Sequence, residues 1–440
     1  MIELAEALAI IEATAVPLPP RRQRLLDASG RLLAADIVSD VDSPPWDRAM
    51  MDGFAVRGED LLARAGSVVE LDVVVDLAAG DVTSLAVSTG CCARIMTGAP
   101  MPAGADAVVP VECAVEETRA THAGGKVRLL DDRFRPGQHV AKQGAAFRAG
   151  QAVLAAGQTL GPGAIGLAAE AGATHVLAAA RPRVAILSTG SELVPADAVP
   201  GFGQTRNSNG PMIAAAVALL DAEPIPLGVA ADRPEAIRAA VAQGLAADIL
   251  LLSGGVSAGD LDLVPGIFRL CGVEKLFHKV RLKPGKPVWF GLLHRPSASP
   301  TLVFGLPGNP ASSLVCFELF VRPAIRILAG RPREEWHLPR SRARLEAPVR
   351  AAEDRPVYLP CRLATTAGRA LATPLPWTGS SDLLGLAAAN GLIALPAGGR
   401  RFDAGDEIDV ALLSSIHDES GHAATGRPAS ARSVSPQKRL

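Results

Sequence analysis

The sequence predicts a multidomain protein of mixed α/β and β class, with a doubly wound, mostly parallel α/β domain, an inserted β-rich domain and a small C-terminal β-domain. Three observations lead to this prediction. The chain of 440 residues is too long for one compact core. Apolar strand candidates alternate with amphipathic helices over residues 182–330. Short β-like runs separated by Gly, Pro and Asp lie on both sides of that region.

The first predicted element is an amphipathic helix over residues 1–15. In MIELAEALAIIEATA the apolar residues recur at helical intervals, and acidic residues stand where a signal peptide would have a basic leader. No apolar run is long enough to span a bilayer. We therefore expect a cytoplasmic protein with no membrane partner.

The β-rich insertion follows the break PLPPRR and occupies residues 43 to about 145. Its strand candidates are SVVELDVVVDL, CARIMTG, ADAVVPVE and GKVRLL. A second helical pattern, GPGAIGLAAEAGA, then covers residues 161–173. The insertion is therefore predicted to lie between two helical segments.

The α/β region combines buried strands with amphipathic helices. Its strand candidates are RVAILSTG, EPIPLGVA, DILLLSGG, TLVFGLP and a pair around HKVRLKPGKPVWF, and its helix candidates are PMIAAAVALLDA, RPEAIRAAVAQGLA, LDLVPGIFRLCG and PASSLVCFELFVRPAIRIL. Continuous apolar strands are typical of a parallel sheet that helices cover on both faces. Ligands of such sheets lie beyond the carboxyl ends of the strands.

The C-terminal region returns to short strands over residues 340–413, and the segment 415–440 lacks apolar periodicity and is expected to be disordered. A formal charge of −1 argues against a chain devoted to binding nucleic acid. The six cysteines form no C-x-x-C pair, so they indicate neither zinc nor redox chemistry.

Three turns at predicted strand ends carry the chemistry: STGSEL (188–193), SGGVSAGDLD (253–262) and GLPGNPASS (305–313). Small residues there expose backbone N–H groups where a helix begins, and such groups favour an anion. A single turn of this kind is weak evidence, because glycines between strand and helix also serve packing. Three in one sheet indicate an anion site. None has the spacing of a P-loop or of a dinucleotide fingerprint.

The segment HKVRLKPGKPVWF supplies cations to this site. If it is extended, Lys279, Arg281 and Lys283 share one face, and the Pro-Gly turn then presents Lys286. The alternative is a solvated edge strand that uses lysines against aggregation. Beside three anion-binding turns, a phosphate or oxyanion site is the better interpretation.

Carboxylates accompany these turns. Glu192 lies in the first turn, and Asp260 and Asp262 lie in the second. Acids beside phosphate-binding turns are typical of a bridging Mg²⁺ ion, although Asp260 is equally suited to cap the following helix.

The β-rich insertion adds one more acid, Asp52, in DRAMMDGFAV, where it stands among apolar neighbours just before a glycine. The stretch RIMTGAPMPAGADAVVPVE ends a strand at Thr97, which is a candidate for a ligand contact. Asp106 in the same stretch is expected to cap a turn rather than to act in catalysis.

Six segments follow one another along the chain: SPPWDRAMMDGFAV, RIMTGAPMPAGADAVVPVE, RPRVAILSTGSELV, SGGVSAGDLD, HKVRLKPGKPVWFG and FGLPGNPASSLVCFELFVRPAI. In this order they resemble the molybdopterin molybdenumtransferase family of molybdenum cofactor synthesis, which includes the gephyrin E-domain. The resemblance runs from about residue 5 to residue 412. It implies a helical and extended stem (1–42 and 146–180), an inserted lid (43–145), an α/β molybdopterin-binding domain (181–330) and a C-terminal β-barrel (333–414).

The resemblance also implies a homodimer in which the lid of one subunit faces the α/β cleft of the other. The family cleaves adenylylated molybdopterin in the presence of molybdate, releases AMP and delivers molybdenum to the pterin dithiolene. The adenylyltransferase that supplies the substrate is a further candidate partner.

Residues of this chain that match the family's motifs receive roles by the resemblance. Asp52, Glu192 and Asp262 would hold Mg²⁺ or position the attacking oxygen, and Lys279 and Lys283 would act on the phosphate or molybdate. Substrate contacts would come from Thr97, Thr189, Gly190, Ser253, Gly254, Gly255, Ser257, Lys286, Pro307, Gly308, Asn309, Pro310 and Ser312.

Three positions depart from the family's pattern. Ala146, Ser191 and Asn207 stand where an acid is usual, and fewer carboxylates mean weaker metal binding. A weakened paralogue acting as an interaction protein is therefore the alternative function. A nucleotide-dependent kinase is a third reading, but the chain shows no P-loop or kinase loop.

Overall fold

The computed structural model describes residues 1–64, 66–256, 263–296, 298–366, 368–413 and 417–418. The chain divides into two compact units, one of Met1–Pro19 with Ala180–Leu440 and the other of Pro20–Ala179. Among the described residues, no helix is both long enough and apolar enough to cross a membrane.

The first unit contains a six-stranded sheet. Its order is β15 (Glu223–Ala230), β12 (Arg183–Thr189), β16 (Ile249–Ser253), β19 (Ala298–Leu306), β18 (Trp289–Arg295) and β17 (Glu274–His278). The first four strands are parallel, whereas β18 and β17 form an antiparallel hairpin at one edge. The chain passes from β12 to β15 on one side and later to β16 on the other, so the sheet has its topological switch point between β12 and β16.

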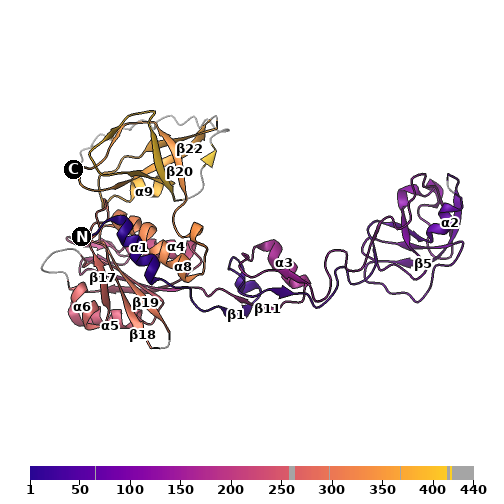
Figure 1. The fold of residues 1–440 in the computed structure, drawn as a ribbon, viewed down its shortest axis with the longest axis horizontal. Helices are drawn as coiled ribbons and strands as arrows, with labels where there is room; N and C mark the ends of the chain where they lie inside the picture. Colours follow the sequence, from indigo (N-terminus) through magenta and orange to yellow (C-terminus); the bar gives the residue numbers. More distant parts are fainter. Residues whose placement is uncertain (65, 257–262, 297, 367, 414–416, 419–440) are drawn as a thin grey trace, which may run out of the picture. The chain divides into compact units, whose positions relative to one another are not determined.

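Helices cover both faces of this sheet, as Figure 1 shows. On β12, Val184 and Ile186 join one apolar core, whereas Ala185 and Leu187 join another on the opposite face. This two-sided burial explains the continuous apolar strands. The first core is covered by α1 (Leu4–Thr14), α4 (Asn209–Leu219), α7 (Pro310–Cys316) and α8 (Arg322–Leu328), and the second by α5 (Pro234–Gly244) and α6 (Val264–Leu270).

The C-terminal part of this unit is a closed five-stranded barrel. Its order is β23 (Arg369–Pro374), β20 (Arg340–Leu345), β26 (Glu407–Leu412), β24 (Gly391–Leu395) and β22 (Val357–Thr366), and β22 pairs back to β23. Further elements are β21 (Val349–Arg350), α9 (Leu384–Ala388), β25 (Arg401–Phe402) and β27 (His417–Asp418). Tyr358, Leu392 and Ala411 of the barrel pack in the same core as α8, which joins the two domains.

The second unit begins and ends in a stem. Its pairs are β1 (Arg21–Arg24) with β11 (His175–Ala178) and β2 (Ile37–Val38) with β10 (Ala152–Leu154), and its helix is α3 (Pro162–Glu170). Chain segments before and after the insertion thus pair with each other. The stem has a small core of its own that includes Leu33, Leu160 and Ala168.

The insertion is a β-rich lid built on a five-stranded sheet. Its order is β7 (Ala107–Pro110), β4 (Gly53–Val56), β6 (Cys91–Ile95), β5 (Val69–Leu77) and β8 (Lys126–Leu129), with α2 (Gly58–Leu62) and the pair β3 (Arg48–Ala49) and β9 (Val140–Ala141) beside it. A Cβ at Gly53 would lie 2.0 Å from the Val109 backbone oxygen. Glycine is therefore required at this position by the neighbouring strand of the same lid.

These elements confirm the predicted fold class, with two local differences. The helix predicted over 310–328 contains a wider π-helical turn, Phe317–Val321, between α7 and α8. Pro323 follows at once, and proline can neither donate an N–H nor tolerate the carbonyl four residues earlier. The segment 279–288 between β17 and β18 is not a regular strand, because Lys279 has a φ of 69° and the Lys283–Pro284 peptide is cis.

Candidate functional site

A polar cleft of about 1390 Å³ opens at the carboxyl ends of the parallel strands in the first unit. The three turns singled out in the sequence all contribute to its lining. Candidate residues that line it are Thr189, Gly190, Glu192, Ser253, Gly254, Gly255, Lys283, Lys286, Pro307, Gly308, Asn309, Pro310 and Ser312. The cleft includes the ends of β12 and β16, so it lies at the switch point where such sheets bind ligands.

The ends of β12 and β16 are packed tightly together. A Cβ at Gly254, whose φ is 98°, would lie 2.6 Å from the Thr189 backbone oxygen. The Gly254 N–H donates to the Leu306 carbonyl at the end of β19, 3.1 Å away. The second turn is therefore held between its two neighbouring strands, and only glycine permits this approach.

The third turn joins the α/β domain to the barrel. The Asn309 side-chain amide donates to Ser380 Oγ over 2.8 Å, and the Ala311 N–H donates to the Ser380 carbonyl over 3.0 Å. Ser380 belongs to a loop between β23 and α9, of which residues 377–381 also line the cleft. The barrel therefore forms one wall of the cleft.

Two lysines supply positive charge to the cleft. Lys283 and Lys286 are exposed and lie on either side of Pro284 and Gly285, which are both buried. The Lys283 backbone bonds to the barrel at Pro356 and Tyr358, which fixes the start of this turn. Charged ammonium groups on a turn held in this way are suited to bind anionic oxygens such as those of phosphate.

The other two cations of the sequence prediction, Arg281 and Lys279, are not among the described residues that line the cleft. The Arg281 guanidinium donates to the Asp354 carbonyl at 2.6 Å. The Lys279 backbone pairs with Ile2 and Val288. The burial pattern keeps the predicted two-residue alternation, because Val280 and Leu282 are buried whereas Lys279, Arg281 and Lys283 are partly or fully exposed.

Sequence reasoning missed one acid of the cleft, Asp232. It follows β15 and its carboxylate accepts the Ser191 N–H at 2.9 Å, while Ser191 Oγ accepts the Asp232 N–H at 3.1 Å. Ser191 is one of the positions where the family usually has an acid, so Asp232 supplies a carboxylate beside it. In the sequence, D-R-P-E before α5 resembles a helix capping box, so Asp232 gives no separate signal that it lines a cleft.

The sequence prediction also did not include the cleft residues that the barrel contributes. Arg355, Trp377 and Ser380 line the cleft although the sequence places them in a separate domain. The Arg355 guanidinium pairs with the neighbouring Asp354 at 2.6 Å. The cluster TGSSD at 378–382 is a turn signal of the same kind as the three in the α/β domain, and could have drawn attention to this loop.

The start of α4 completes the cleft wall. Asn207 Oδ1 accepts the Gly210 N–H at 3.0 Å and the Ser188 hydroxyl at 3.1 Å, so this residue caps the helix where the family usually has an acid. Asn209 donates to the Gly308 carbonyl at 2.8 Å and thereby ties α4 to the third turn.

The predicted lid residues lie together in the second unit. Thr97 donates both its N–H and its hydroxyl to Asp52 Oδ1, each over 2.7 Å. These two bonds, with the charge of Arg94 nearby, lower the pKa of Asp52, and the carboxylate is exposed. Asp106 accepts the N–H of Gly58, the first residue of α2, at 2.7 Å, so its carboxylate bonds a helix start distant in sequence and not the turn of its own stretch.

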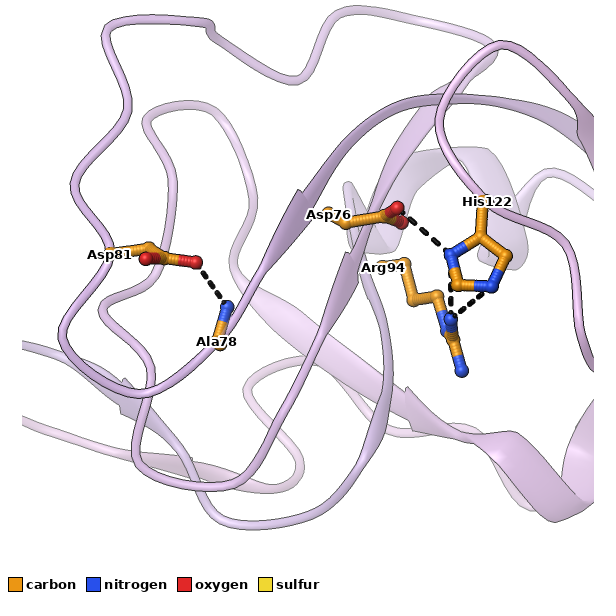
Figure 2. Close-up of polar contacts among 5 residues, drawn as sticks. All are labelled: Asp76, Ala78, Asp81, Arg94 and His122. Atoms are coloured by element: carbon orange, nitrogen blue, oxygen red, sulfur yellow. Dashed lines mark hydrogen bonds and ion pairs between the residues drawn. The ribbon is translucent and has the colours of Figure 1, made fainter.

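Arg94 is itself held in place. Figure 2 shows the His122 imidazole between the Asp76 carboxylate, 3.0 Å from Nδ1, and the Arg94 guanidinium, 3.0 Å from Nε2. Asp81, in the same view, accepts the N–H of Ala78. The lid thus presents an ionised carboxylate with a fixed cation nearby.

Four predicted positions remain. Ser257, Asp260 and Asp262 lie outside the described residues. Ala146, where the family usually has an acid, is exposed in the second unit, and its N–H donates to the Ser43 carbonyl at 2.9 Å.

The cleft fits the predicted magnesium ion only in part. Within the described parts of the chain, no three His, Cys, Asp or Glu side chains gather to hold a metal. Glu192 and Asp232 both line the cleft, and the Glu192 carboxylate lies against the backbone of Gly190. Mg²⁺ commonly binds through one or two carboxylates together with substrate phosphates, so these two acids suit an ion that a phosphorylated ligand helps to hold.

Three known families match consecutive parts of the chain. The MoeA N-terminal region (domain I and II) matches residues 2–172, the probable molybdopterin binding domain matches residues 185–327, and the MoeA C-terminal region (domain IV) matches residues 342–413. Together they cover both units and every wall of the cleft.

Relatives and solved structures agree with these matches. A molybdopterin molybdenumtransferase from Bacillus subtilis (strain 168) is 35% identical over 406 residues, which are 90% of this chain and 90% of the relative. One from Nostoc sp. (strain PCC 7120) is 36% identical over 389 residues, 88% and 87% of the two chains. The crystal structure of the molybdopterin biosynthesis MoeA protein from Pyrococcus horikoshii has a TM-score of 0.75 at 30% identity, covering 94% of this chain and 100% of that one.

Proposed function

Because this chain belongs to the molybdopterin molybdenumtransferase family, we propose that its cleft binds adenylylated molybdopterin and molybdate, transfers molybdenum to the pterin dithiolene and releases AMP. The chain is a transferase that inserts molybdenum into molybdopterin in the synthesis of the molybdenum cofactor. The substrate form, the molybdenum source and the leaving group are the parts that we propose.

One observation supports this chemistry above the others. Three strand-end turns and two lysines line a single cleft, so ammonium donors stand beside these turns around the same space. A phosphoanhydride and molybdate are both rich in anionic oxygens, and these are the groups that such donors bind. The relatives carry the enzyme's name, which supports the enzyme rather than the interaction protein.

Catalysis in this cleft would rest on orientation and charge neutralisation. Molybdate is itself a nucleophile, so the protein needs to hold its oxygen in line with the phosphorus and to stabilise the charge that develops on the departing phosphate. Lys283 and Lys286 would neutralise that charge. Glu192 and Asp232 would hold a Mg²⁺ ion, which would supply further charge stabilisation, and Asp262 remains a predicted third acid.

We also propose a homodimer in which Asp52 and Thr97 of one lid face the cleft of the other subunit. The lowered pKa and exposure of Asp52 support this, because an ionised carboxylate on an open surface is available to a metal ion or cation that another chain brings. A cytoplasmic location and direct transfer from the adenylyltransferase are further proposals.

The test is AMP release from adenylylated molybdopterin with and without molybdate. We expect release to depend on molybdate, and Lys283→Ala to lower the rate by about 100-fold or more, as the loss of one charge-stabilising donor does elsewhere. Lys275→Ala is the matched control, because Lys275 is exposed on β17 and outside the lining of the cleft. Full turnover by Lys283→Ala would contradict the assignment.

A further inference from the structure

Arg94 is the cation that the lid sheet places beside Asp52. On β6 it lies opposite Phe54 of β4 and opposite Asp76 of β5. Opposite residues of paired strands share a face of the sheet, and Asp52 precedes Phe54 by two residues, so Asp52 and Arg94 emerge on the same side. After the hydrogen bonds from Thr97, the charge of Arg94 also lowers the pKa of Asp52, which agrees with this placement.

The guanidinium of Arg94 is held by a neutral partner. The His122 ring lies between Arg94 and Asp76 (Figure 2). An ionised carboxylate can only accept, so His122 Nδ1 donates to Asp76, and Nε2 accepts from Arg94 Nη1 over 3.0 Å. A protonated ring would have no acceptor left, so this contact requires the neutral imidazole. Arg94 is therefore fixed in position without a direct ion pair to a carboxylate of the described chain.

The other donors of Arg94 are open. The residue is half-buried, and its Nε and Nη2 groups form no hydrogen bond within the parts of the chain that the structure describes. Neither is one of the buried polar atoms that lack a partner there, so both are open to solvent. These two groups form one edge of the guanidinium, and such an edge can donate two parallel hydrogen bonds to an oxyanion.

We infer that Arg94 binds two oxygens of the anionic ligand in the cleft of the other subunit, and that His122 is the positioning residue of Arg94. This inference rests on the proposed function and its homodimer, in which Asp52 faces that cleft. Lys283 and Lys286 line the cleft from the first unit, so the lid would add a further cation from the second copy of the chain. Phosphate and molybdate are both tetrahedral oxyanions and share the chemistry that Arg94 recognises.

Binding of AMP and of molybdate to the full chain, measured by calorimetry without Mg²⁺, tests the role of Arg94. We expect Arg94→Gln to weaken AMP, molybdate or both by about tenfold or more, as the loss of a charge-assisted hydrogen bond does. The ligand that weakens identifies the oxyanion. Asp52→Asn should not weaken either, because it removes a negative charge. Equal weakening by Asp52→Asn would show that Arg94 acts only through the acid, and would overturn the inference.

The matched control is Arg128→Gln. Arg128 is an exposed arginine on β8, an edge strand of the same lid sheet. This variant should bind both ligands as the wild type does. A loss equal to that of Arg94→Gln would contradict the inference, because the effect would then come from the general charge of the lid.

The positioning role of His122 is tested by the KM for adenylylated molybdopterin in molybdate-dependent AMP release. His122→Leu should raise this KM about tenfold, as Arg94→Gln does. His122→Gln should keep the wild-type value, because an amide can donate to Asp76 and accept from Arg94. An equal rise in the two His122 variants would refute the positioning role.

Failure of this inference is distinguishable from failure of the proposed function. If the wild type releases AMP with molybdate while Arg94→Gln binds and turns over equally well, the inference fails and the proposed function stands. A wild type that binds neither AMP nor molybdate would refute both.

Discussion

At the scale of single residues, the lid shows how local hydrogen bonds shift the pKa of a functional group. Thr97 donates two hydrogen bonds to one oxygen of Asp52, and these bonds lower the pKa of the carboxyl. The backbone donor is fixed by the end of β6, whereas the hydroxyl depends on the identity of the side chain. Threonine at position 97 therefore acts on Asp52 and need not contact the ligand itself.

Replacing Thr97 by Val should raise the pKa of Asp52, because the carboxylate loses one of the two donors that stabilise its charged form. The carboxyl ¹³C shift of labelled aspartates, followed through a pH titration, would report the change, and Asp52→Asn would assign the signal. Because the pKa of Asp52 is lower in the folded chain than in the unfolded chain, ionised Asp52 stabilises the folded state at pH values above the ordinary Asp pKa. This stabilisation is lost as the pH falls through the pKa of the folded state. An unchanged titration curve would refute the role of Thr97.

At the scale of elements, the π-helical turn Phe317–Val321 shows a conflict between a local signal and tertiary packing. The apolar pattern of 310–328 continues through Pro323. The helix accommodates this proline by widening one turn to a π-helical turn, and it does not end there. Within it, Glu318 and Arg322 form an ion pair of 2.5 Å whose side chains are largely buried.

Glu318→Ala should destabilise the first unit by about 3 kcal/mol, because it leaves the Arg322 charge buried without its partner. Urea denaturation would measure the free energy of unfolding. Glu335→Ala is the control, since Glu335 is more exposed and lies 3.8 Å or more from Arg331 and Arg326. A half-exposed pair of this kind contributes about 1 kcal/mol or less. Equal losses in the two variants would show that burial of the pair is not the cause.

At the scale of the whole molecule, the chain has two units, each with separate apolar cores. The cleft is complete within the first unit, because the core that α8 shares with the barrel holds both walls. Asp52 belongs to the second unit. A site that needs both the lysines and Asp52 can therefore be divided between two copies of the chain.

A complementation experiment tests the shared site. Asp52→Asn and Lys283→Ala should each be inactive alone, whereas a co-assembled mixture should recover about one quarter of the wild-type rate of AMP release. Half of the dimers would be mixed, and one of the two sites in each would be intact. Lys283→Ala mixed with Lys286→Ala should recover nothing, because both defects lie in the same cleft. No recovery in the first mixture would show that each site is built from a single chain.

The sequence alone determined the fold class and the three turns, because hydrophobic period, glycine and proline act within a few residues and leave a local pattern. It could not show that Asp232 stands beside Ser191, or that the barrel adds Arg355 and Trp377 to the cleft. Those facts depend on contacts between residues distant in sequence. Only the packed chain decides them, because packing is chosen by the total free energy of all contacts and not by any one segment.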